Sequence, residues 1–452
     1  MMNFLPEKLK NIARALNFPL FVVGGAVRNH IAFGTKSLDI DLSSCVSTEE
    51  FVLALGTVGL IPRAVYPRTG TVMFEIDGFK IEYTSFRTEK YRGGEHTPYS
   101  VEFTSDIEKD ALRRDFKCNA VYYDILTGKF NDPLGGLSDI KKGVLDTVKS
   151  PDLVFCSDGL RLMRLARFCG ELGFKPTIQV LDSATKFSKN ILDVSPERVF
   201  SELKMILLAD QKYPFSPKNG HYLALEILDR TRVLDQIMIE LTEGRNMVQR
   251  ADYHKFDVLK HSLKTVQFSP PKIRLAALLH DVGKPYCFKK TGRYFAHAEQ
   301  GAIIAKNILN RLKADNATIS RVIRLITAHM LDMELNMRES KLRRFIVKNA
   351  DIFDDLLLLK QADFKAGLES EEISPTVLKW QKLMQKMRAD KTPFSYSDLS
   401  IKPEQLIEKG CKGEQIGRKM RELFDFAVMN PQKNNFSDLS RFLDCTNNRD
   451  DK

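Results

Sequence analysis

The apolar residues of this chain change their spacing once, and this change limits the possible folds more than any other feature. Up to about residue 145, short β-rich runs at residues 20–23, 71–76, 80–84 and 120–124 alternate with helical patterns. From Asp158 onward the apolar residues recur about every 3.6 positions, as they do in amphipathic helices. The sequence therefore predicts an α+β fold, in which an N-terminal α/β head with a mixed sheet is followed by helical regions.

The length of 452 residues is more than one ordinary hydrophobic core accommodates, so we expect several domains. A polar stretch begins at Gly244, and an acidic stretch after residue 368 ends in Pro375. Both are typical of domain boundaries. We expect an α/β head at 1–145, a helical neck and body at 146–245, a histidine-bearing helical domain at 254–370 and a helical tail at 371–452.

The charge and the cysteines restrict the class of protein. Lys and Arg number 69 against 58 Asp and Glu, and the net charge of +11 favours a polyanionic partner such as nucleic acid. The seven cysteines include no Cys-x-x-Cys pair, which is typical of reduced thiols in the cytoplasm. No apolar run reaches the roughly 18 residues of a membrane span. We therefore expect a cytoplasmic protein without a membrane partner.

A glycine pair follows the first β-rich run. Gly24 and Gly25 come directly after the apolar residues 21–23, and Arg28 follows them. A backbone without Cβ atoms can approach an anionic phosphate closely, and the arginine can then clamp that phosphate. Gly24, Gly25 and Arg28 are therefore candidate nucleotide-binding residues. Because glycine pairs are also common in turns, a purely structural turn is the alternative.

Two carboxylates follow on the next expected strand. Asp39 and Asp41 are two residues apart, so their side chains share one face of a strand and their Cα atoms lie roughly 6.6 Å apart. Carboxylate oxygens suit Mg²⁺, and a two-metal site stabilises both oxygens of an in-line displacement at phosphorus. This order of glycine loop and carboxylate pair indicates nucleotidyl transfer. Taken alone, an Asp-x-Asp pair is more often only solvated.

Two arginine-rich segments complete the expected nucleotide site. Arg113 and Arg114 precede the run 120–124, where they could hold triphosphate or ribose oxygens; a surface ion-pair cluster is an equal alternative. In the second segment every third residue is charged, which spreads these side chains over one side of a helix; a solvated basic face is the alternative. Its charged residues are Asp158, Arg161, Arg164 and Arg167. An Asp and Arg pair can match the Watson–Crick edge of cytosine or adenine, which predicts base selection.

A second group of metal-ligand residues lies between 254 and 363. It consists of His261, His280, Asp281, His297, His329 and Asp363. We expect His280 and Asp281 to be adjacent on a helix, so that they approach an ion from two sides. Imidazole and carboxylate ligands suit a divalent metal that activates water on a phosphoester. A single histidine on an apolar helix is usually only packed, but this ordered set indicates a metal centre.

The blocks in the first 210 residues resemble, in their order, the class II tRNA nucleotidyltransferase/poly(A) polymerase family. They are Gly24 to Arg28, Asp39 with Asp41, 82–87, 113–116, 132–136, Asp158 with Arg161, and 195–204. The resemblance implies that Asp39 and Asp41 bind catalytic Mg²⁺. It also implies that Gly25, Arg28 and Arg114 hold the triphosphate or sugar of the incoming nucleotide. Glu82 is a further candidate carboxylate near the metals, with a β-sheet ion pair as the alternative.

The same resemblance implies template-independent addition of CCA to the 3′ end of tRNA. Asp158 and Arg161 would select CTP and then ATP, with Arg164 and Arg167 in support. The tRNA 3′-hydroxyl would attack the α-phosphate and release pyrophosphate. An enzyme that adds only A, only CC, or a poly(A) tail is the alternative within the family. A metal phosphohydrolase with an RNA-binding head is the alternative outside it.

The histidine set resembles the HD phosphohydrolase superfamily. His261, His280, Asp281 and Asp363 match its metal ligands, and His297 and His329 match auxiliary positions. The resemblance implies phosphatase or phosphodiesterase activity with Mn²⁺, Ni²⁺ or Mg²⁺; a purely structural metal is the alternative. A glycine-containing stretch at 406–417 before a basic helix resembles the C-terminal tail of the same nucleotidyltransferases, which implies a tRNA contact.

Two positions depart from the nucleotidyltransferase pattern. The family usually has Asp where this chain has Asn29, which removes one carboxylate near the glycine loop. It usually has Glu where this chain has Ser157, directly before Asp158. That Glu would orient the template arginine, so we expect Ser157 to affect base selection.

Overall fold

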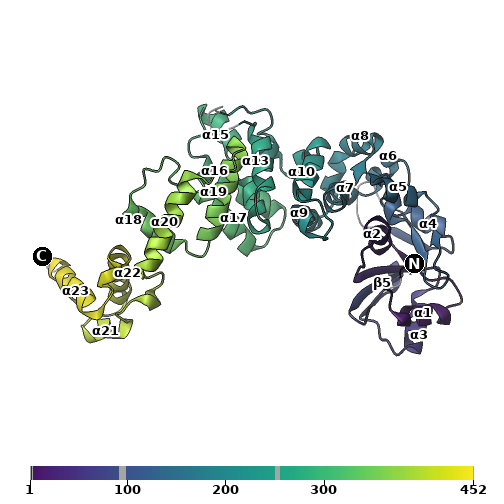
Figure 1. Cartoon of the computed structure of the whole chain (residues 1–452), viewed down its shortest axis with the longest axis horizontal. Coiled ribbons are helices and arrows are strands. Elements are labelled where there is room, and N and C mark those ends of the chain that lie inside the picture. Colours follow the sequence, from purple (N-terminus) through teal and green to yellow (C-terminus); the bar gives the residue numbers. More distant parts are fainter. Residues whose placement is uncertain (1, 3, 91–97, 250–254, 451–452) are drawn as a thin grey trace. The chain divides into compact units, whose positions relative to one another are not determined.

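The computed structural model describes residues 2, 4–90, 98–249 and 255–450 (Figure 1). The chain divides into two compact units. The first comprises residues 1–242 with 311–314, and the second comprises 243–310 with 315–452. Residue 254, where we expect the third domain to begin, lies outside the described residues. The finer division into four domains stays a prediction.

The first unit contains a seven-stranded mixed sheet with the order β3-β4-β5-β2-β1-β8-β9. Its strands are β1 (Phe21–Val23), β2 (Asp39–Ser44), β3 (Ala64–Tyr66), β4 (Thr71–Ile76), β5 (Phe79–Ser85), β8 (Tyr122–Asp124) and β9 (Phe130–Asn131). Strands β2 and β5 run parallel, and the other neighbours run antiparallel. This confirms the expected α/β head with a mixed sheet. Strand β1 pairs antiparallel with β2, so Val23 at the end of β1 lies opposite Asp41 near the start of β2.

Most of the other elements of the first unit are helices. They are α1 (Glu7–Ala15), α2 (Gly25–Phe33), α3 (Thr48–Thr57), α4 (Ile107–Leu112), α5 (Gly136–Lys142), α6 (Pro151–Ser157), α7 (Leu160–Leu172), α8 (Ile178–Lys186), α9 (Pro196–Leu207), α10 (Gly220–Arg230), α11 (Val233–Ile237) and α12 (Ile239–Thr242). Two small sheets accompany them: β6 (Arg87–Lys90) with β7 (Ser100–Phe103), and β10 (Val144–Leu145) with β11 (Lys175–Pro176). The neck is therefore not wholly helical, because β11 pairs parallel with β10.

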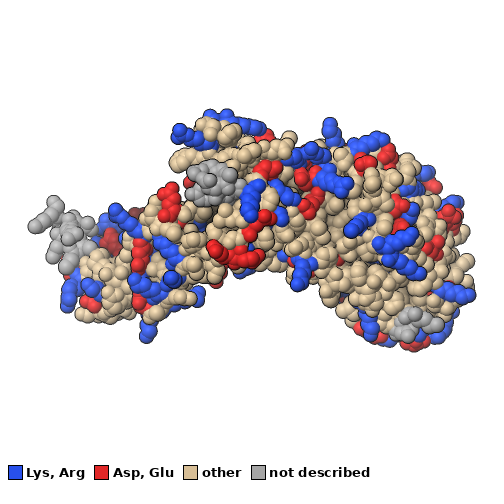
Figure 2. Space-filling model, turned by 45° about the horizontal axis from the view of Figure 1, so that its top comes forward, with Lys and Arg blue, Asp and Glu red and all other residues tan. Residues whose placement is uncertain are grey.

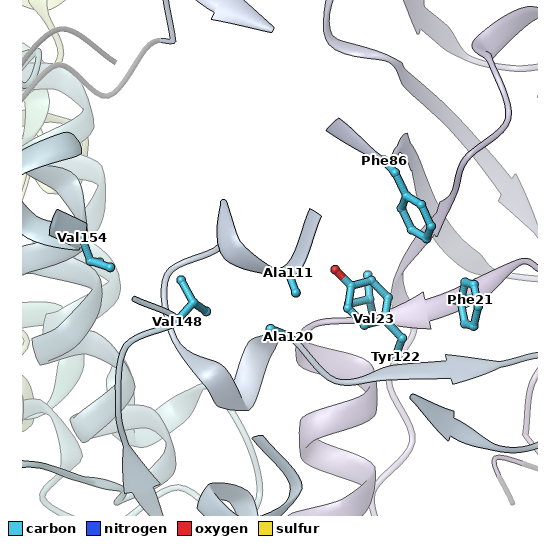
Figure 3. Packing of buried hydrophobic residues seen from close by; sticks show 8 residues of the cluster. All are labelled: Phe21, Val23, Phe86, Ala111, Ala120, Tyr122, Val148 and Val154. Carbon is cyan, nitrogen blue, oxygen red and sulfur yellow. The ribbon is translucent and has the colours of Figure 1, made fainter. Parts of the chain in front are cut away.

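An aromatic core joins the sheet to α4. The rings of Phe21 and Phe86 both pack edge-on against Tyr122, with centroids 6.0 Å apart (Figure 3). Ala111 of α4 belongs to the same buried cluster. The Tyr122 hydroxyl donates to Asp110 Oδ2 at 2.7 Å. Packing of the core therefore fixes the position of a buried carboxylate on α4.

Helices make up the second unit. They are α13 (Val258–Gln267), α14 (Arg274–Leu279), α15 (Lys284–Thr291), α16 (His297–Arg311), α17 (Asn316–Ala328), α18 (Glu339–Lys348), α19 (Phe353–Leu368), α20 (Pro375–Ala389), α21 (Pro403–Glu408), α22 (Glu414–Met429) and α23 (Phe436–Asp450). Helix α13 packs against α14 and α19, and α17 packs against both α14 and α19. These four helices and the start of α16 form the frame of the histidine cluster. Within the described residues, no helix is both long and apolar enough to cross a membrane.

Candidate functional site

Gly24 connects β1 to α2 and lies directly against Asp41. Its φ of +76° is in the left-handed region, where a residue with a Cβ is strained. A Cβ added to Gly24 would also lie only 2.8 Å from Asp41 Oδ2. Glycine is therefore required here both by the backbone conformation and by the close approach of the carboxylate.

The two aspartates of β2 lie on its open face. Ile40 and Leu42 are buried, whereas Asp39 and Asp41, which alternate with them, are exposed. Asp41 lies opposite Glu82 of β5 in the parallel register. Desolvation by the surrounding protein raises the pKa of Glu82, and the negative charge of Asp41 raises it further. The three carboxylates line a cavity of about 270 Å³, which suits positively charged ligands.

A second cavity, of about 430 Å³, adjoins Asp41 and is rich in arginine. Of the residues expected to bind nucleotide, it is lined by Gly24, Gly25, Arg28, Arg113, Arg114, Asp158, Arg161, Arg164 and Arg167. The structure thus brings residues that are far apart in the sequence to one site. Asp41 lines both cavities, while Asp39 lines the smaller one. Desolvation raises the pKa of Asp41, and the charges of Arg114 and Arg164 act in the opposite direction.

Arg28 is held in place by two amide side chains. Its Nε and Nη2 donate to Asn29 Oδ1 at 3.0 and 2.9 Å, and its Nη1 donates to Asn119 Oδ1. Asn29 stands where a carboxylate is usual in the family. Its amide oxygen still orients Arg28, but it adds no negative charge beside the glycine loop.

Asp110 fixes both members of the arginine pair. Arg113 Nε donates to its Oδ1 at 2.7 Å, and Arg114 Nη2 donates to its Oδ2 at 3.1 Å. Burial opposes ionisation of Asp110, but the two guanidinium groups hold its pKa at about 2. The pair is therefore an ion-pair cluster that also lines the cavity. The sequence analysis missed Asp110, although its spacing of three and four residues from the arginines was a usable signal.

Helix α7 supplies further arginines and an aromatic ring. Arg164 donates twice to Asp115 Oδ2, at 2.8 and 2.6 Å, and Arg167 Nε donates to Glu202 Oε2 at 2.7 Å. Phe168 lies beneath three guanidinium groups, at centroid distances of 4.6 to 5.1 Å: those of Arg28, Arg164 and Arg167. These cation–π contacts hold the positive charges close together. Phe168 had no signal of its own in the sequence.

Asp158 and Arg161 form a pair at the start of α7. Asp158 Oδ2 lies 3.6 Å from Arg161 Nε, and Arg161 Nη2 donates to the Arg113 carbonyl at 2.6 Å. Arg161 Nη1 also donates to Ser157 Oγ at 3.2 Å. The smaller Ser157 side chain therefore still orients Arg161. Burial raises the pKa of Asp158 to about 6, although the charge of Arg161 lowers it.

The histidine cluster forms inside the second unit. His261 lies on α13, His297 begins α16 and Asp363 lies on α19, while His329 follows the end of α17. The expectation that His280 and Asp281 lie on a helix is wrong, because α14 ends at Leu279 and both residues follow it in a turn. Two triads could each hold a metal ion: His261, His280 and Asp281, and Asp281, His297 and His329.

The hydrogen bonds of the imidazoles fit a metal centre. The Nδ1 atoms of His280, His297 and His329 each lie 2.6 to 2.8 Å from the carbonyl oxygen three residues earlier. If Nδ1 donates this bond, Nε2 is left as a lone-pair donor for a metal. Asp363 Oδ1 lies 2.9 Å from His261 Nε2, which adds a second carboxylate to the cluster. Lys284 Nζ lies 2.6 Å from Asp281 Oδ2.

Gly283 allows the turn that carries His280 and Asp281 to pack against α16. A Cβ added to it would lie 2.2 Å from the His297 carbonyl oxygen and 2.6 Å from the Gly301 nitrogen. The turn after Asp281 therefore packs directly on the first turns of α16. The six cysteines whose side chains are described are free, and none of them belongs to either triad.

Two regions of the chain match known protein families. Residues 20–146 match the poly(A) polymerase head domain, and residues 247–356 match the HD domain. Asp363 lies beyond the matched HD residues, and the fold brings it to the cluster. The chain also resembles a solved structure, the CCA-adding enzyme of Bacillus stearothermophilus in complex with CTP, with a TM-score of 0.67 at 19% identity, covering 99% of this chain and all of that chain.

Three curated relatives extend over most of the chain. The A-adding tRNA nucleotidyltransferase of Deinococcus radiodurans is 30% identical over 372 residues, covering 78% of each chain. The CC-adding tRNA nucleotidyltransferase of Thermus thermophilus is 28% identical and covers 90% of this chain and 88% of its own. The multifunctional CCA protein of Xanthomonas campestris is 27% identical and covers 89% and 96%. The chain therefore belongs to the tRNA nucleotidyltransferase/poly(A) polymerase family and carries an HD domain.

Proposed function

We propose that the chain adds CCA to the 3′ end of tRNA, using CTP and ATP. The observation that carries this proposal is the arginine-rich cavity, which joins the glycine loop, Asp41 and the Asp158–Arg161 pair. Seven arginines line it, which suits a triphosphate. A relative that adds only A and another that adds only CC are both similar to this chain, so these activities and poly(A) synthesis are the alternatives.

Asp39 and Asp41 would hold Mg²⁺, because carboxylate oxygens on one open face of β2 are the ligands that this ion prefers. When bound, Mg²⁺ stabilises the charge that develops on the phosphate during displacement. Arg28 and Arg114 then hold the triphosphate so that the α-phosphate faces the tRNA 3′-hydroxyl. Their orienting partners, Asn29 and Asp110, keep both guanidinium groups in place before the nucleotide binds.

Asp158 and Arg161 would select the base. The carboxylate accepts from the exocyclic amine of cytosine or adenine, and the guanidinium donates to the adjacent ring nitrogen. Uracil and guanine present a carbonyl oxygen where the amine should be, so they repel the carboxylate. Arg164 and Arg167 support this pair through their own anchors, Asp115 and Glu202.

The partner is proposed to be the acceptor end of tRNA. Lys and Arg side chains are spread over the face drawn in Figure 2, among Asp and Glu, and the net charge of +11 favours a polyanion. Helix α22 carries the exposed Arg418 and Arg421, and we propose a tRNA contact there; Lys419 of the same helix is buried. A cytoplasmic location stays a prediction.

The direct test is nucleotide incorporation into a tRNA transcript that lacks CCA. With Mg²⁺ and a single nucleotide at a time, CTP should be incorporated, whereas UTP and GTP should not. ATP should be incorporated only after CTP. Incorporation of all four nucleotides, or of none, would contradict the proposal.

A second candidate function is phosphoester hydrolysis by the HD domain. The observation that favours it is the buried cluster of four histidines and two aspartates, which could hold a divalent metal such as Mn²⁺, Ni²⁺ or Mg²⁺. Bound metal would lower the pKa of water, and the cluster would place that water next to a phosphoester. The test is metal-dependent hydrolysis of a model phosphodiester by the full chain.

Changing Gly24 to alanine should inactivate the head. Gly24 combines a φ of +76° with a ψ of −139°, so alanine should cost about 1–3 kcal/mol in the free energy of unfolding. The new Cβ should displace the Asp41 carboxylate and lower the rate of addition about 100-fold. Gly34→Ala is the matched control, because its φ is +66° and no described atom lies within 4 Å of the new Cβ. Chemical denaturation should show the larger loss for Gly24→Ala, because its ψ is −139° whereas that of Gly34 is 13° in the αL region. Only Gly24→Ala should lose activity. Equal activities would contradict the placement of Asp41.

Base selection should depend on pH through Asp158. Burial raises its pKa to about 6, so the carboxyl takes up a proton as the pH falls from 7.5 to 5.5. The protonated group can donate to uracil O4, so the preference for CTP over UTP should fall about tenfold. Asp158→Asn is the control, because its amide does not titrate and its preference should not change with pH. The measurement is single-turnover incorporation of each nucleotide, and a constant preference in the parent enzyme would contradict this role.

A further inference from the structure

We propose that the Tyr213 hydroxyl donates a hydrogen bond to the terminal phosphate of the incoming nucleotide, and that this contact distinguishes a nucleoside triphosphate from a diphosphate. Tyr213 lies between the short 3-10 helix Ala209–Gln211 and α10, and it lines the arginine-rich cavity. No sequence motif of the nucleotide site includes it. Tyr213 would thus add a contact to the nucleotidyl transfer proposed above, on which this inference rests.

The segment that carries Tyr213 is fixed to both α7 and α2. Ser216 Oγ donates to the Glu171 carbonyl of α7 at 2.8 Å and accepts from the Tyr213 backbone N–H at 3.2 Å. The Phe215 ring stacks on Phe33, the last residue of α2, with centroids 3.7 Å apart. The Tyr213 ring stacks in turn on Phe215, with centroids 4.9 Å apart and planes 9° apart. Tyr213 is therefore held at the cavity before a nucleotide binds.

Tyr213 lies at the phosphate end of the cavity. The pair that would select the base is at the start of α7, whereas Glu171, which anchors the Tyr213 segment, is near the end of the same helix, about 15 Å from Arg161. Arg28 follows the glycine loop that would hold the triphosphate, and its guanidinium lies over Phe168, one turn before Glu171. Tyr213 therefore shares the part of the cavity that the phosphates would occupy, away from the base.

The hydroxyl is the part of Tyr213 that is left for a ligand. Phe215 covers one face of the ring, and Lys212 Nζ lies 5.6 Å from the ring centroid. The hydroxyl makes no hydrogen bond to the residues that the structure describes. Hydrogen bonds to charged phosphate oxygens are among the stronger ones, and the Lys212 ammonium favours an anion at this place. The terminal phosphate fits because it is the one farthest from the base.

The experiment measures nucleotide binding and not turnover. Dissociation constants of CTP and CDP are determined by isothermal titration calorimetry with the full chain and Mg²⁺, without tRNA. Tyr213→Phe keeps the stacked ring, so it should weaken CTP binding about tenfold and leave CDP binding unchanged. Tyr66→Phe, an exposed tyrosine of β3 outside both cavities, is the matched control and should bind both nucleotides as the parent does.

The pair of nucleotides separates a phosphate contact from a structural role. Equal weakening of CTP and CDP binding in Tyr213→Phe would mean that the hydroxyl only supports the cavity, and would overturn the proposal. Unchanged CTP binding would overturn it as well, and a loss confined to Tyr213→Leu would then identify stacking by the ring. If Tyr213→Phe loses the preference for CTP but the parent extends no tRNA transcript, the phosphate contact stands and only the proposed transfer is refuted.

Discussion

Replacing Asp41 with asparagine is expected to slow nucleotide addition about 10³-fold, the effect of losing a principal electrostatic contact to the transition state. The side chain keeps its size, so the close contact with Gly24 is preserved. Because desolvation raises the pKa of Asp41, removing its charge should not lower the free energy of unfolding. The rate is measured by single-turnover incorporation of labelled CTP.

Binding of tRNA should be retained in this variant, since Asp41 contacts the metal and not the RNA in our account. Fluorescence anisotropy with labelled tRNA checks this. Asp182→Asn, an exposed carboxylate on α8, is the control and should behave as the parent. Addition at the parent rate by Asp41→Asn would rule out the carboxylates of β2 as the catalytic centre.

Replacing His280 with alanine should reduce phosphoester hydrolysis at least about 10²-fold and leave CCA addition unchanged. His280 is fully buried, and its Nε2 lies within 3.5 Å of both aspartates of the cluster. Without it, the triad with His261 and Asp281 loses an imidazole, and ligand-shell losses of this kind cost about 10–100-fold or more. In our account, nucleotide addition uses residues of the first unit, whereas His280 lies in the second.

The rates of CCA addition and of phosphoester hydrolysis are measured in both Asp41→Asn and His280→Ala. Asp41→Asn should lose addition and keep hydrolysis, and His280→Ala should show the reverse. Loss of both activities in His280→Ala, with an unchanged circular dichroism spectrum, would contradict two independent sites. His30→Ala should change neither.

Local pattern was enough to predict much of the head. The four β-rich runs became β1, β4, β5 and β8, and the spacing of Asp39 and Asp41 gave their common face. The strand order was out of reach, because pairs such as β2 with β5 join segments separated by α3 and two other strands. The two-residue strands β10 and β11 are too short to show an apolar period.

The site was predicted from residue types and not from contacts. Asp110 and Phe168 position arginines of the cavity, yet nothing in the sequence marks a ring that lies beneath three guanidinium groups. The end of α14 was also missed. Gly283 must approach the backbone of α16 within a distance that only a glycine allows, so the chain turns at His280 and Asp281.

The measurement that tests the central claim most directly is product length on three tRNA transcripts, ending before C, after CC and after CCA. Each is incubated with the full chain, Mg²⁺ and CTP plus ATP, and the products are resolved at single-nucleotide length. Our account predicts three nucleotides added to the first, one to the second and none to the third. Addition of only A or only CC would assign a specialised activity. A long ladder, or no extension of any transcript, would contradict the account.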